Sequence, residues 1–99
     1  MSNNRVLIVD DEDSLLRFMK RNLEVRNFKV HSASNGLEAL AIFEKESIDL
    51  IILDVMMPHM DGLETLSRIR EYSKVPIVVL SALGEEQDKG KALNLGADD

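Results

Sequence analysis

The residues best suited to chemistry in this sequence are acids that follow two apolar runs. Residues 6–9 (Val-Leu-Ile-Val) lead into Asp10 and Asp11, and residues 50–53 (Leu-Ile-Ile-Leu) lead into Asp54. Parallel strands of an α/β sheet end at one edge, where such folds bind their ligands, so neighbouring runs would bring these three carboxylates together. Crowded carboxylates raise one another's pKa unless a cation neutralises them, and hard oxygen ligands around an open position suit Mg²⁺. The pattern therefore predicts a magnesium site.

A carboxylate site that holds Mg²⁺ is suited to phosphoryl transfer. A carboxylate beside Mg²⁺ can attack an activated phosphoryl group and form an acyl phosphate. Phosphoryl transfer depends mainly on positioning and charge neutralisation, so a small site suffices. The backbone carbonyl of Met56, just past Asp54, is a candidate further ligand. Ser81, at the end of the apolar run 76–80, is placed to donate a hydrogen bond to a phosphoryl oxygen.

Each of these residues also has a purely structural interpretation. The acids at positions 10–13 suit the positive end of a helix dipole. Asp54 could be a turn residue ahead of the break at Pro58. Ser81, taken alone, is better explained as a helix N-cap. Acids at the ends of both apolar runs favour the metal site and reactive carboxylate over these separate explanations.

The elements that must position these residues alternate regularly. Strands are expected over residues 5–9, 28–33, 50–53 and 76–80, and helices over residues 13–25, 37–46, 62–71 and 85–95. Strands alternating with helices predict an α/β fold, a parallel sheet covered on both faces with right-handed crossovers. The two most apolar runs belong side by side in its centre, and residues 28–33 near an edge. In the helix over 37–46, Leu37, Leu40, Ala41 and Phe43 are expected to face inward.

Composition sets the class of protein. Ninety-nine residues make one domain, and a hydrophobic fraction of 44% supports a core. Eighteen acidic against twelve basic residues give a net charge of −6, which argues against direct binding of nucleic acid. The absence of cysteine excludes disulfides and thiolate zinc sites. We find neither a membrane-spanning stretch nor a signal-peptide pattern, and expect a cytoplasmic protein.

Five segments together resemble the response regulator receiver domain of two-component signalling, in order along the chain. They are residues 6–12 (VLIVDDE), 35–40 (NGLEAL), 49–62 (DLIILDVMMPHMDG), 76–82 (PIVVLSA) and 96–99 (GADD). The resemblance implies a flavodoxin-like three-layer α/β/α fold with strand order 2-1-3-4-5, of which this chain would hold 2-1-3-4. It also implies a phosphoacceptor rather than an ordinary enzyme, one that assists its own phosphorylation and dephosphorylation.

The same resemblance assigns roles to the candidate residues. Asp54 would accept a phosphoryl group from a histidine kinase or phosphotransfer protein. Asp10 and Asp11 would bind Mg²⁺ together with Asp54 and the carbonyl of Met56. Ser81 would be the switch residue, whose hydroxyl moves to hydrogen-bond the phosphoryl group once Asp54 is phosphorylated. These assignments agree with the chemistry expected from the residues themselves.

The sequence departs from the family after Asp99. Receiver domains continue into a fifth strand, an active-site lysine and a fifth helix, so residues 1–99 are expected to be a truncated receiver domain without an output domain. The missing lysine predicts impaired phosphorylation. The missing strand would expose the edge of the strand over 77–80, which predicts a homodimer through that edge, including by domain swapping.

Two other functions are alternatives for this sequence. The first is an engineered or dissected receiver fragment that acts only as a self-associating structural unit; failure to bind Mg²⁺ while folded would favour it. The second is a phosphohydrolase of the haloacid dehalogenase type. That family carries an Asp-x-Asp pattern after its first strand, which the adjacent Asp10 and Asp11 fit poorly.

Overall fold

A computed structural model describes residues 4–54 and 62–80 of the chain. The elements in this part are β1 (Arg5–Val9), α1 (Asp13–Val25), β2 (Lys29–Ala33), α2 (Gly36–Lys45), β3 (Leu50–Asp54), α3 (Gly62–Arg70) and β4 (Ile77–Leu80). They match the expected elements to within two residues at each end. The helix expected over residues 85–95 lies outside the described residues.

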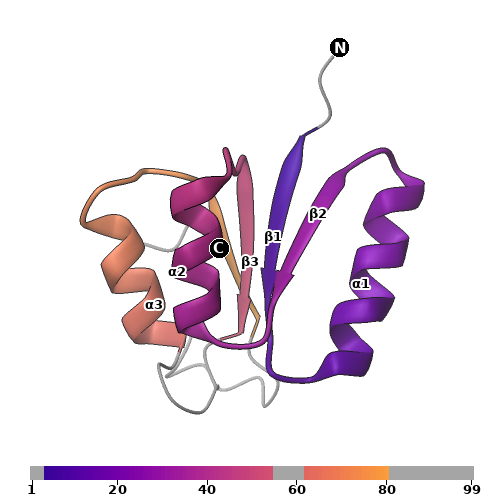
Figure 1. The fold of residues 1–99 in the computed structure, drawn as a ribbon, viewed down its shortest axis with the longest axis horizontal. Coiled ribbons are helices and arrows are strands. Elements are labelled where there is room, and N and C mark those ends of the chain that lie inside the picture. The colour runs from indigo at the N-terminus through magenta and orange to yellow at the C-terminus, as the bar shows by residue number, and fades with distance from the viewer. Residues whose placement is uncertain (1–3, 55–61, 81–99) are drawn as a thin grey trace.

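The four strands form one parallel sheet in the order β2-β1-β3-β4 (Figure 1). This confirms the expected order, with the two most apolar strands adjacent. Their register pairs Val9 with Leu53, so the residues that follow, Asp10 and Asp54, come at the same level of neighbouring strands. The sheet therefore brings the two acidic strand ends together.

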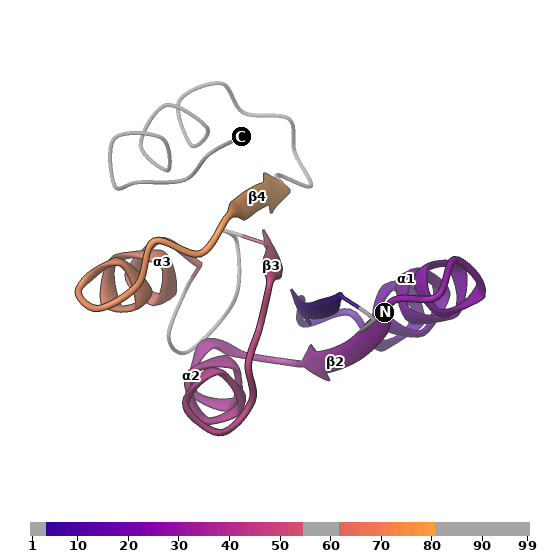
Figure 2. The same ribbon diagram turned by 90° about the horizontal axis from the view of Figure 1, so that it is seen from above.

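The sheet is covered on both faces, as its apolar strands require. Figure 2 shows α1 on one side and α2 and α3 on the other. Towards α2 and α3, a core cluster includes Leu7, Ile51, Leu53 and Leu66, and the opposite cluster joins β1 and β2 to α1 through Leu16. Burying each such side chain contributes about 1.5–3 kcal/mol to stability. The three-layer architecture is thus confirmed, with β1 at most 1% exposed from Val6 to Val9.

The α2 helix corrects one expectation. Leu37 is 61% exposed and Ala41 is also exposed, whereas Ala39 is fully buried. The helix is capped at its start: the Asn35 side chain accepts a hydrogen bond from the Glu38 amide at 2.9 Å, and the Glu38 carboxylate accepts one from the Ser34 amide. The inward face of the helix then runs through Gly36, Ala39, Leu40 and Phe43, which leaves Leu37 outside it.

Polar contacts at the amino ends of the strands fix the register of β1 against β3. The Arg5 amide donates to Oδ2 of Asp49 at 2.7 Å, and the Asp49 amide donates to the Arg5 carbonyl at 2.8 Å. The Arg5 guanidinium also pairs with Glu46 at 3.0 Å. Because a strand slip would break these bonds, they help to hold the opposite, acidic ends in line. Within the described residues, no helix is long and apolar enough to cross a membrane.

Candidate metal and phosphoacceptor site

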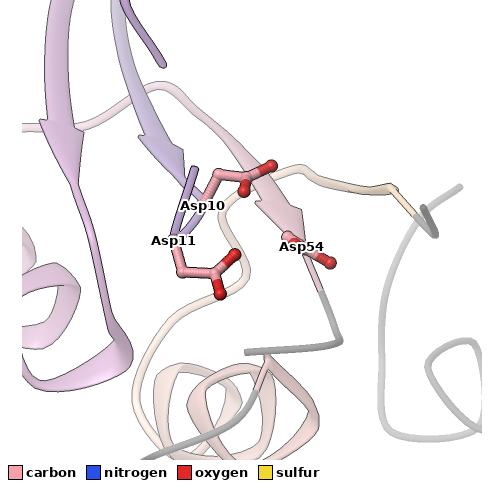
Figure 3. A group of neighbouring side chains, drawn as sticks. All are labelled: Asp10, Asp11 and Asp54. Atoms are coloured by element: carbon pink, nitrogen blue, oxygen red, sulfur yellow. The ribbon is translucent and has the colours of Figure 1, made fainter. Parts of the chain in front are cut away.

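Three carboxylates meet at the carboxyl edge of the sheet. Asp10 and Asp11 follow β1, and Asp54 is the last residue of β3. One oxygen from each lies within 4.8 Å of the other two, and Figure 3 shows the three side chains grouped at this edge. The convergence predicted from the two apolar runs is present in the structure.

The backbone explains why these side chains meet. Neighbouring strands lie about 4.8 Å apart, so residues at the same level of β1 and β3 are close. The Asp10 amide donates to the Ala33 carbonyl at 3.1 Å, which extends the hydrogen-bond ladder between β1 and β2 by one residue. Asp10 and Asp54 are each 4% exposed, whereas Asp11 is exposed. The cluster is therefore buried on the strand side and open on one side.

Burial and like charge act together on Asp10. Burial, with smaller contributions from the charges of Asp54 and Asp11, raises the pKa of its carboxyl from the ordinary 3.8 to about 6. The Glu12 amide, which donates to Oδ1 of Asp10 at 3.0 Å, acts in the opposite direction because it favours the carboxylate. An added positive charge would relieve the repulsion that the fold imposes here.

The donor set fits a hard divalent cation. All three groups offer carboxylate oxygens, the hard ligands that Mg²⁺ prefers. Among residues 4–54 and 62–80, the cluster contains neither the imidazole nor the thiolate that a zinc site would favour. Asp10, Asp11 and Asp54 would hold the ion.

Two predicted site residues, Met56 and Ser81, lie outside the described residues, so their roles stay predictions. One contact was missed at the level of sequence, the Glu12 amide on Asp10. The signal was present, because an aspartate often accepts a hydrogen bond from the amide two residues further on.

Fold and site together define a parallel α/β domain with a cluster of three carboxylates at the edge where such folds bind their ligands. The response regulator receiver domain family matches residues 6–99. The chain therefore belongs to the response regulator receiver domains, as the motifs had indicated.

A curated relative is similar to this chain over nearly its whole length. The transcriptional regulatory protein SrrA of Staphylococcus aureus is 42% identical over 97 residues, covering 98% of this chain and 40% of SrrA. The chain thus spans less than half the length of this curated relative.

Solved structures give the same fold. The Francisella response regulator 1452 receiver domain has a TM-score of 0.90 at 34% identity, covering 98% of this chain and 81% of that one. The Vibrio cholerae chemotaxis protein CheY4 has a TM-score of 0.91 at 33% identity, covering 97% and 82%. Thermotoga maritima TrrA, solved in complex with Mg²⁺–BeF, has a TM-score of 0.85 at 33% identity, covering 96% and 82%.

Proposed function

We propose that this chain is a phosphoacceptor of two-component signalling, in which Asp54 takes a phosphoryl group from a histidine kinase or phosphotransfer protein. The observation that carries the proposal is the position of Asp54, at the end of a central strand, with its carboxylate within 4.8 Å of those of Asp10 and Asp11. Membership of the receiver family supports it. So does the likeness to TrrA, which was solved with Mg²⁺–BeF.

The transfer needs one nucleophile and one leaving group. A carboxylate oxygen of Asp54 attacks the phosphorus of a donor phosphohistidine. The new P–O bond forms as the P–N bond breaks, and the electron pair stays on the imidazole nitrogen, which takes up a proton. The product is an acyl phosphate on Asp54. When bound, Mg²⁺ would neutralise charge on the phosphoryl oxygens.

The neighbouring groups would bind the metal ion and the phosphoryl group in this step. Asp10 and Asp11 would hold Mg²⁺ at the open side of the site, and the Met56 carbonyl would be a further ligand. The Ser81 hydroxyl would donate a hydrogen bond to the transferred phosphoryl group. The buried sheet edge keeps Asp54 in one place, which is the main requirement of a phosphoryl transfer.

The test is incubation with acetyl phosphate and Mg²⁺ followed by intact-mass measurement. We expect a mass increase of a single phosphoryl group, which does not form when EDTA removes the metal and is absent from Asp54→Asn. Asp13→Asn, which removes an exposed acid at the same end of the sheet, is the matched control and should react like the wild type. An adduct of equal yield on Asp54→Asn would refute the assignment.

Two expectations from the sequence stay predictions. Impaired phosphorylation would show as an adduct yield well below one per chain at saturating acetyl phosphate. The homodimer through the β4 edge depends on residues after Leu80, which lie outside the described residues; light scattering on an eluting column peak measures it. A folded dimer that neither binds Mg²⁺ nor forms an adduct would favour the purely structural alternative.

A further inference from the structure

The turn between β1 and α1 contains a contact that bears directly on the metal site. Oδ1 of Asp10 accepts a hydrogen bond from the Glu12 amide at 3.0 Å. Asp10 is 4% exposed, so few orientations are open to its side chain. The amide comes from the chain's own backbone, two residues on, and therefore needs no distant packing to be in place.

This contact restrains a carboxylate that belongs to the metal site. Oδ1 of Asp10 is held by the turn, and the Asp10 carboxylate contributes an oxygen to the three-aspartate cluster. The Asp10 backbone is itself fixed, because its amide donates to the Ala33 carbonyl at 3.1 Å. Backbone and side chain of this residue are thus both restrained before any ion arrives.

Glu12 is also where α1 begins. It is the N-cap residue of the helix, with φ −100° and ψ 106°, and its own side chain makes no capping hydrogen bond. The Leu16 amide donates to the Glu12 carbonyl at 3.1 Å as the first turn closes. Its amide points to Asp10 and its carbonyl into the helix, so the same peptide segment joins the metal site to α1.

We propose that the backbone amide of Glu12 is a positioning group of the site, which orients the Asp10 carboxylate for Mg²⁺. This inference rests on the proposed function of the three aspartates. Loss of an outer partner of a metal ligand typically weakens metal affinity 10- to 100-fold, so about a tenfold or larger effect is expected.

The first test removes the donor. Glu12→Pro has no amide hydrogen, and Asp13→Pro is its matched control. Position 13 is the first helical residue, where proline is tolerated, and the extended ψ of Glu12 suits a residue before proline. Both variants also lose one exposed acid. Mg²⁺ affinity is followed through backbone amide NMR shifts in each folded variant.

We expect Glu12→Pro to bind Mg²⁺ about tenfold or more weakly than the wild type, and Asp13→Pro to stay within about twofold. Equal, wild-type affinity in both variants would overturn the proposal while leaving the proposed function intact. A wild-type protein that binds no Mg²⁺ would instead defeat the proposed function.

The second test needs no variant of Glu12 and no metal. Hydrogen exchange of the Glu12 amide is compared in the wild type, Asp10→Asn and Asp10→Ala. Asparagine keeps an acceptor oxygen and alanine does not, so we expect slow exchange in the first two proteins and about tenfold faster exchange in the third. The same rate in the wild type and Asp10→Ala would overturn the proposal, even if Glu12→Pro fails to fold.

Discussion

Replacing Asp10 by asparagine should stabilise the metal-free protein at neutral pH. In the folded chain, burial and the neighbouring charges of Asp54 and Asp11 raise the pKa of the Asp10 carboxyl to about 6, whereas the unfolded chain keeps the ordinary 3.8. The fold therefore binds this proton more tightly than the unfolded chain does. Its contribution to stability is fully present below pH 3.8 and is lost as the pH rises through about 6.

The size of the effect follows from that difference. Between 3.8 and about 6, at about 1.4 kcal/mol per pKa unit, the wild type would lose at most about 3 kcal/mol. The site is open on the side of Asp11, where water screens the charges, so we expect about 1–3 kcal/mol. Asparagine carries no charge and its amide oxygen can still accept the Glu12 hydrogen bond, so Asp10→Asn should escape this loss.

The assay is urea unfolding in EDTA at pH 4.5, 6 and 7.5. About 1 kcal/mol of the loss already occurs below pH 4.5, so the free energy of unfolding of Asp10→Asn minus that of the wild type should grow by about 1–2 kcal/mol between the lowest and highest pH. Asp13→Asn, an exposed acid outside the cluster, should show a nearly constant difference. A constant difference for Asp10→Asn as well would refute the reasoning, because the penalty would then not come from the charge.

The remaining predictions concern the metal and the helix ends. Mg²⁺ at 100 times its dissociation constant should stabilise the wild type by about 2.7 kcal/mol in urea unfolding, and an unchanged midpoint would argue against binding to the folded state. Asn27 has φ 71°, in the left-handed region that glycine adopts without strain. Asn27→Ala should therefore lower the free energy of unfolding by about 1–2 kcal/mol and Asn27→Gly should lower it little; equal losses of stability would contradict this. Asn35→Ala removes the α2 cap and should cost about 1 kcal/mol, seen as a lower thermal midpoint. Leu66→Ala in the core should lower the free energy of unfolding by about 2–5 kcal/mol, and Leu37→Ala at the exposed position by less than about 0.5 kcal/mol. Similar losses of stability in the two variants would contradict the burial of Leu66 and the exposure of Leu37.

The sheet was predictable because its strands carry their own signal. Val6 to Val9 and the run over residues 50–53 are apolar on both faces, which occurs where helices cover a parallel sheet on both sides. Once these strands are neighbours, Asp10 and Asp54 meet through register alone. The core of the candidate site therefore followed from the sequence, with the family resemblance adding the roles of its residues.

Local geometry was harder to predict. Helical spacing predicts that Leu37 faces the core together with Leu40, but the inward face of α2 runs through Gly36, Ala39 and Leu40, and Leu37 is exposed. The contact between the Glu12 amide and Asp10, and the raised pKa of Asp10, depend on burial and on sub-ångström placement. Periodicity carries no information on either.

The central claim is that Asp54 becomes the acyl phosphate, and borohydride trapping tests it most directly. Borohydride reduces an acyl phosphate to the alcohol with release of phosphate, so a phosphorylated aspartate becomes homoserine. Trypsin releases residues 46–68 as one peptide, which holds Asp49, Asp54 and Asp61. Tandem mass spectrometry after treatment with acetyl phosphate and Mg²⁺ should find homoserine at position 54 alone. Homoserine at another of these positions, or an unmodified peptide from a protein that binds Mg²⁺, would contradict the account.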